Sequence, residues 1–122
     1  MDTGCCCGGS SIMLMACSGG SNVGQLSNEV ARQLTVEGKG MMFCLAGVGG
    51  QVPNIVQQTK DAERVIVIDG CSVACAKKAM ELAGCTNFEW VELTAAGIEK
   101  NKNLELNPEE IAAAREAVED LL

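Results

Sequence analysis

The sequence contains no histidine and no tyrosine, and its aromatic residues are two phenylalanines and one tryptophan. A hydrophobic core must therefore be built from aliphatic side chains and the six methionines. Without histidine, a metal site is restricted to sulfur, oxygen or exogenous ligands. Without imidazole ligands, the eight cysteines are the main candidates for binding a metal ion.

Basic residues are also scarce, because nine Lys and Arg stand against sixteen Asp and Glu, for a formal charge of −7. This balance, with no large cluster of Lys or Arg, argues against a nucleic-acid partner. Apolar runs are far shorter than a membrane span, so a soluble protein without a membrane partner is expected. The first residues have no basic segment followed by an apolar one, which favours a reducing cytoplasm over secretion.

The length of 122 residues suits one domain, and 48% hydrophobic with 20% charged residues makes global disorder unexpected. We expect a flexible cysteine-rich arm over residues 1 to 10 and a single α/β domain over residues 11 to 122. In a reducing compartment, dense cysteine without histidine indicates metal or redox chemistry rather than structural disulfides.

Strand-like and helix-like segments alternate along the chain. Buried-strand patterns cover residues 12–16, 41–45 and 65–68, and a mixed apolar and acidic pattern over 88–93 is typical of an edge strand. Helices are expected from Val23, after Pro53, from a cap at Ser72 and after an Asn107-Pro108 cap, with a flexible loop at 46–50. The order predicts a small three-layer, Rossmann-like α/β domain with a mainly parallel, four-stranded sheet.

Three cysteines end three different predicted strands: Cys17, Cys44 and Cys71. Cys75 follows Cys71 by about one helical turn, near a helix start that favours a thiolate. In a parallel sheet all strand C-termini lie at one edge, so these four sulfurs are predicted to meet there. Four thiolates suit tetrahedral zinc, and the same residues would hold an iron–sulfur cluster; the spacing does not choose between them.

Other residues are candidates for positions around the metal ligands or for an accessory site. Asp69 could orient a ligand, and Ser18 and Lys77 lie close to the predicted ligands in sequence. Cys5, Cys6 and Cys7 form a candidate accessory site on the arm, for loading or resolving the main site. Cys85 follows a helix at the opposite sheet edge, where a packing role is favoured.

The stretch Asp69-Gly70-Cys71, with Cys75-Ala76-Lys77-Lys78, resembles the signature of the DGC-domain family, which is described as zinc-binding and cysteine-rich. Cys17-Ser18-Gly19 and Cys44-Leu45-Ala46-Gly47 are similar to the two earlier cysteine motifs of that family. The resemblance covers roughly residues 12 to 100. It implies four functional cysteines, which map onto Cys17, Cys44, Cys71 and Cys75, and it implies no established reaction.

We therefore expect a cytoplasmic metal-binding protein that holds Zn²⁺, or another thiophilic ion, at the C-terminal edge of its sheet. The alternative is an iron–sulfur or reactive-thiol redox protein that uses the same cysteines, and whether the chain is an enzyme stays open. The expected partners are the ion and a protein that accepts metal or sulfur, and self-association into a homo-oligomer also stays open.

Overall fold

The structure is a computed structural model, and it describes residues 11–122. The predicted arm over residues 1 to 10, with Cys5, Cys6 and Cys7, lies outside the described residues. The elements in chain order are β1 (Ile12–Ala16), α1 (Asn22–Val36), β2 (Met41–Met42), α2 (Leu45–Gly49), α3 (Pro53–Asp61), β3 (Arg64–Asp69), α4 (Cys75–Leu82), β4 (Glu89–Glu92), the 3-10 helix η2 (Thr94–Ala96) and α5 (Pro108–Glu119).

The four strands form one parallel sheet in the order β2-β1-β3-β4, as the alternating pattern predicts. β1 pairs with both β2 and β3, and β3 pairs with β4. β3 is buried along nearly its whole length, which explains its run of β-branched residues. The chain places β2 on one side of β1 and β3 on the other, so the connections reverse direction between β1 and β3. Such a reversal opens a crevice at the C-terminal ends of these two strands.

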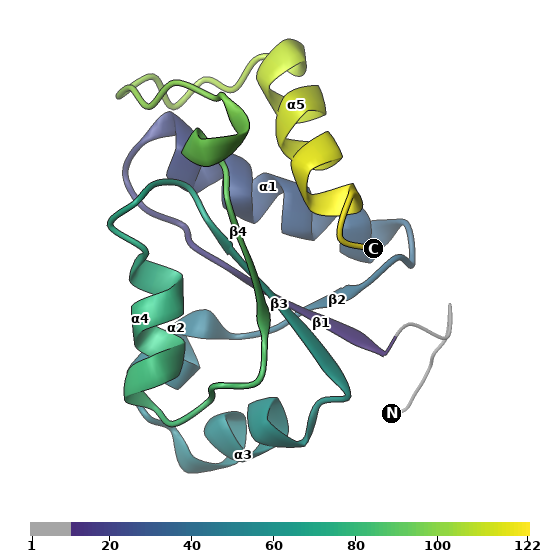
Figure 1. The fold of residues 1–122 in the computed structure, drawn as a ribbon, viewed down its shortest axis with the longest axis vertical. Helices are drawn as coiled ribbons and strands as arrows, with labels where there is room; N and C mark the ends of the chain where they lie inside the picture. The colour runs from purple at the N-terminus through teal and green to yellow at the C-terminus, as the bar shows by residue number, and fades with distance from the viewer. Residues whose placement is uncertain (1–10) are drawn as a thin grey trace.

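Helices cover both faces of the sheet and complete the three layers (Figure 1). One aliphatic core lies between the sheet and helices α1 and α5. The other lies between the sheet and helices α2, α3 and α4, where Val48, Met80 and Cys85 are buried. Both cores lie on the faces of the sheet, which leaves the strand ends free to form a site. None of the helices in the described part of the chain combines the length and apolar character that a membrane crossing requires.

Local sequence signals explain the starts of α1, α3 and α5. The Ser21 side chain accepts from the backbone N–H of Gly24 at 3.1 Å and caps α1. Asn107 caps α5 in the same way, accepting from the N–H of Glu110 at 2.8 Å, with Pro108 as the first helical residue. The predicted starts of these two helices, and of α3 at Pro53, are confirmed.

Three predictions about elements are wrong. The second strand ends at Met42, and the expected loop over 46–50 contains helix α2, because burial of Val48 outweighs the weak helix propensity of its glycines. Helix α4 begins at Cys75 rather than after Ser72, since Ala74 adopts a left-handed backbone with φ of 58° and interrupts any earlier helix.

Candidate functional site

A cavity of about 190 Å³ lies at the ends of β1 and β3, where the sheet topology reverses. We call it the thiol pocket, because three cysteines line it together with Gly19, Gly20, Ser21, Val23, Gly24, Asp69, Gly70, Val73, Lys100 and Lys102. The three cysteines are Cys17, Cys71 and Cys75. They come from three segments separated in sequence, so the parallel sheet brings them together.

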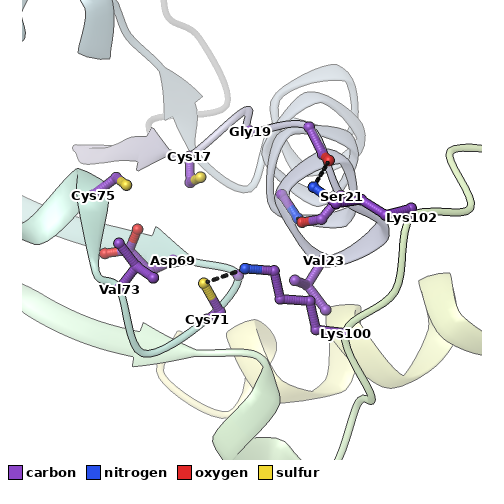
Figure 2. Close-up of a pocket in the computed structure, with 13 residues that line it drawn as sticks. Cys17, Gly19, Ser21, Val23, Asp69, Cys71, Val73, Cys75, Lys100 and Lys102 are labelled. Atoms are coloured by element: carbon purple, nitrogen blue, oxygen red, sulfur yellow. Dashed lines mark hydrogen bonds between the residues drawn. The ribbon is translucent and has the colours of Figure 1, made fainter.

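Cys17 follows β1 and is fixed by its backbone, whose N–H donates to the carbonyl of Ile68 at 2.9 Å. Burial raises the pKa of the Cys17 thiol, hydrogen bonds from Gly19 and Gly70 lower it, and the charges of Asp69 and Cys75 raise it further. Cys17 and Cys75 line the same cavity. Figure 2 shows Cys17, Cys71 and Cys75 around one opening.

Cys71 lies on the loop after β3 and is half-buried. Its sulfur accepts a hydrogen bond from the Lys100 ammonium at 3.4 Å. Lys100 reaches it from a segment 29 residues further along the chain (Figure 2). A positive charge therefore lies directly beside one of the three thiols.

Cys75 is the first residue of α4, and its side chain is exposed at the pocket. The helix has no side-chain cap from its own N-cap residue, Ala74. Asp69, which is 1% exposed, supplies the cap from the end of β3. Its carboxylate accepts from the N–H groups of Ala76 at 2.8 Å and Lys77 at 2.9 Å. Asp69 thus sets the start of α4 and with it the position of Cys75.

The same carboxylate accepts from the indole Nε1 of Trp90 at 2.9 Å. The Lys77 ammonium lies over the Trp90 ring, 4.5 Å from its centroid, and Lys77 does not line the thiol pocket. The cation placed at a cysteine is Lys100 instead.

The Ser18 hydroxyl accepts from Gln25 Nε2 at 3.4 Å, and Ser18 is likewise absent from the pocket wall.

Gly70 allows the loop after β3 to lie directly against the start of α1. A Cβ at this position would stand 2.6 Å from the carbonyl carbon of Val23 and 2.8 Å from the backbone nitrogen of Gly24. Gly24 makes a similar close approach to the backbone of Gly19. The glycine of the Asp-Gly-Cys motif is therefore required by backbone contact at the pocket floor.

We expect Gly70→Ala to destabilise the domain by about 2 to 3 kcal/mol, because the added methyl group must displace backbone rather than a flexible side chain. Urea unfolding of wild type and variant measures this difference. Gly20→Ala is the matched control, since Gly20 lines the same pocket and a Cβ there meets nothing within 4 Å. Equal midpoints for the two variants would contradict the close-contact explanation.

The segment that carries Lys100 is held by Asn22, which is fully buried. The Asn22 amide donates to the Glu99 carbonyl at 2.8 Å and to the Glu110 carboxylate at 3.1 Å. Its side-chain oxygen accepts from the N–H of Asn101 at 2.6 Å. Lys100 therefore sits between two anchored residues. Lys102, on the same segment, donates to the Gly20 carbonyl at 3.1 Å.

Sequence reasoning missed Lys100 and Lys102, because residues 94–106 have no clear periodicity. One signal was present: a segment that follows a parallel edge strand must begin at the sheet edge where the cysteines were expected.

Cys44 does not line the thiol pocket. The prediction that it ends a strand is wrong, because β2 stops at Met42 and Cys44 is the exposed N-cap residue of α2. Cys85 is buried in the core beside α4, as a packing residue would be. All of the cysteines between residues 11 and 122 are free thiols.

Within residues 11–122, no group of three or more Cys, Asp or Glu side chains is gathered closely enough to hold a metal ion as the side chains lie. The four-cysteine site therefore stays a prediction. The wall of the thiol pocket nevertheless carries three thiols, which is the donor chemistry of thiophilic ions.

Comparison with known proteins gives a family and one curated relative. A family model described as DGC domain matches residues 13–118. A Pseudomonas aeruginosa protein named "Anaerobic and virulence modulator AnvM" is 42% identical over 65 residues, which cover 53% of this chain and 50% of that protein. The match therefore spans about half the length of the relative. No solved structure matches the chain.

Proposed function

This chain belongs to the DGC-domain family, and from its geometry we propose that it binds a thiophilic metal ion, zinc by expectation, as cargo in the thiol pocket. One observation carries the proposal: Cys17, Cys71 and Cys75 line a single cavity although they come from three separate segments. Thiolates are the preferred protein ligands of such ions.

The thiol pocket is better suited to an ion that binds reversibly than to a permanent structural metal. Both aliphatic cores lie on the faces of the sheet, so the fold has its stability away from the pocket. The three sulfurs must also move together before they can share an ion, and Cys71 must leave Lys100. A site that requires such rearrangement suits exchange with a partner protein in a reducing cytoplasm.

The residues of the thiol pocket account for the charge of a bound zinc ion and for the proton that its binding releases. Three thiolates on Zn²⁺ leave one net negative charge, and Lys100 beside Cys71 offsets it. Since burial raises the pKa of Cys17, its thiol must release a proton as it binds the ion, so capture is favoured by higher pH. The fourth coordination position is left to Cys44, as the family pattern implies, or to an exogenous ligand.

A second candidate is a redox dithiol formed by Cys17 and Cys75. The observation that favours it is that both cysteines line the same cavity. Oxidation would join their sulfurs with loss of two protons and two electrons to a thiol-oxidising acceptor. The iron–sulfur alternative uses the same pocket thiols.

Anaerobic purification, an absorption spectrum and elemental analysis separate these functions. We expect a colourless protein that binds close to one zinc per chain after loading with Zn²⁺. Cys44→Ser tests the fourth ligand: unchanged zinc affinity favours an exogenous ligand, and lost affinity favours a four-cysteine site. A brown protein with visible absorption bands would indicate an iron–sulfur cluster in place of zinc. A protein that retains no thiophilic ion would refute the proposal.

A further inference from the structure

The thiol pocket has a basic wall in an acidic protein. The chain carries a formal charge of −7, yet Lys100 and Lys102 both line this cavity. Asp69 is the acidic residue among the lining side chains, and its carboxylate is buried and occupied by three hydrogen-bond donors. Among the lining side chains the two ammonium groups therefore outnumber the single carboxylate.

The backbone of the segment that carries Lys100 is held in place. The buried Asn22 side chain bonds to the backbone on both sides of Lys100, and the Asn22 N–H donates to the Asn101 carbonyl at 3.0 Å. Glu110 of α5 accepts from the same amide and joins this anchor to the rest of the fold. The Lys100 segment is thus a built wall of the pocket.

Helix α1 adds to the positive potential. Its N-terminus begins at this edge with no acidic residue in its first turn, whereas the N-terminus of α4 is capped by the Asp69 carboxylate. The lysines and this helix end lie on the wall around the thiols, as Figure 2 shows for Lys100, Lys102 and Ser21. A ligand that enters this cavity meets thiols and ammonium groups, with Lys100 directly beside Cys71.

We infer that the thiol pocket selects small anionic ligands, with the anionic group at Lys100 and Lys102 and a soft atom toward Cys17 and Cys75. The fitting class is a small thiol that bears a carboxylate, alone or as the ligand of a metal ion. A cavity of about 190 Å³ has room for a small molecule of this class. The metal-bound form rests on the proposed function, whereas selection of an anion by the two lysines does not.

Alkylation with a matched pair of reagents tests this selection without any metal. Iodoacetate and iodoacetamide have nearly the same shape and differ in charge; each forms a sulfur–carbon bond to a thiolate and expels iodide. The rate at each cysteine is followed by peptide mass spectrometry. At Cys71 and Cys75 we expect the ratio of iodoacetate to iodoacetamide rates to exceed the ratio at Cys44 by about three- to tenfold at low ionic strength.

Using a rate ratio cancels any effect of Lys100 on the intrinsic reactivity of Cys71, and Cys44 reports the repulsion of anions by the whole protein. The Lys100→Met/Lys102→Met variant is expected to lower the pocket ratio to that of Cys44. Lys39→Met/Lys60→Met removes the same charge from outside the pocket lining and is expected to leave the ratio unchanged.

Equal ratios at the pocket cysteines and Cys44, or equal effects of the two double variants, would overturn the inference. Zinc binding by the wild-type protein is measured separately. Loss of anion selectivity with retained zinc binding therefore refutes the inference alone, while retained selectivity without zinc binding refutes only the proposed function.

Discussion

Cys71→Ser and Cys75→Ser are each expected to weaken zinc binding by about 100-fold or more while the domain stays folded. A serine hydroxyl is a poor ligand for zinc, so each variant removes one of three thiolates from the pocket wall. The fold should survive, because Cys75 is exposed and Cys71 is only a partly buried contact of one core. Affinity is measured by competition with a chromophoric chelator, and folding by circular dichroism on the same sample.

Cys85→Ala separates this effect from the general loss of a cysteine. Cys85 is buried beside α4 and lies outside the thiol pocket, so its removal should lower stability without changing zinc affinity. If Cys71→Ser unfolds the protein together with the loss of zinc, the ion is structural and the cargo proposal is wrong.

Asp69→Ala is expected to lower the free energy of unfolding by about 3 to 5 kcal/mol, because it leaves three donors without their carboxylate. Two of them are the N–H groups of Ala76 and Lys77 in the first turn of α4, and the third is the indole of Trp90. Trp90 is the single tryptophan, so its fluorescence reports both the local change and urea unfolding. The variant should also weaken zinc binding, since Cys75 is the first residue of that helix.

Asp61→Ala provides the matched control for removal of a carboxylate. Asp61 is exposed and accepts from Gln57 at 3.0 Å, so its loss should change stability by less than about 0.5 kcal/mol. A similarly small change for Asp69→Ala would show that the remote cap does not stabilise α4. A large loss of stability with unchanged zinc affinity would remove the proposed link between Asp69 and Cys75.

Much of the architecture was predictable from local patterns. The β-branched run that became β3, and the caps at Ser21 and Asn107, specify elements through short-range physics. Alternation of strands with helices then requires crossovers, and crossovers place the ends of parallel strands at one edge. That reasoning is enough to put Cys17 and Cys71 near each other, because each lies within two residues of the end of a strand and the two strands pair in the sheet.

What the sequence alone determined is therefore the α/β class, the parallel sheet and the edge at which thiols gather. Tertiary structure decided which residues reach that edge: burial of Val48 turned the segment after Cys44 into a helix, and Asn22 brought Lys100 to Cys71 from a stretch without periodicity. It also made Asp69 a cap for a helix that begins six residues later. The physical reason is that periodicity encodes only which face of an element is buried, whereas a buried polar side chain takes whichever partner the packed chain brings within hydrogen-bond distance.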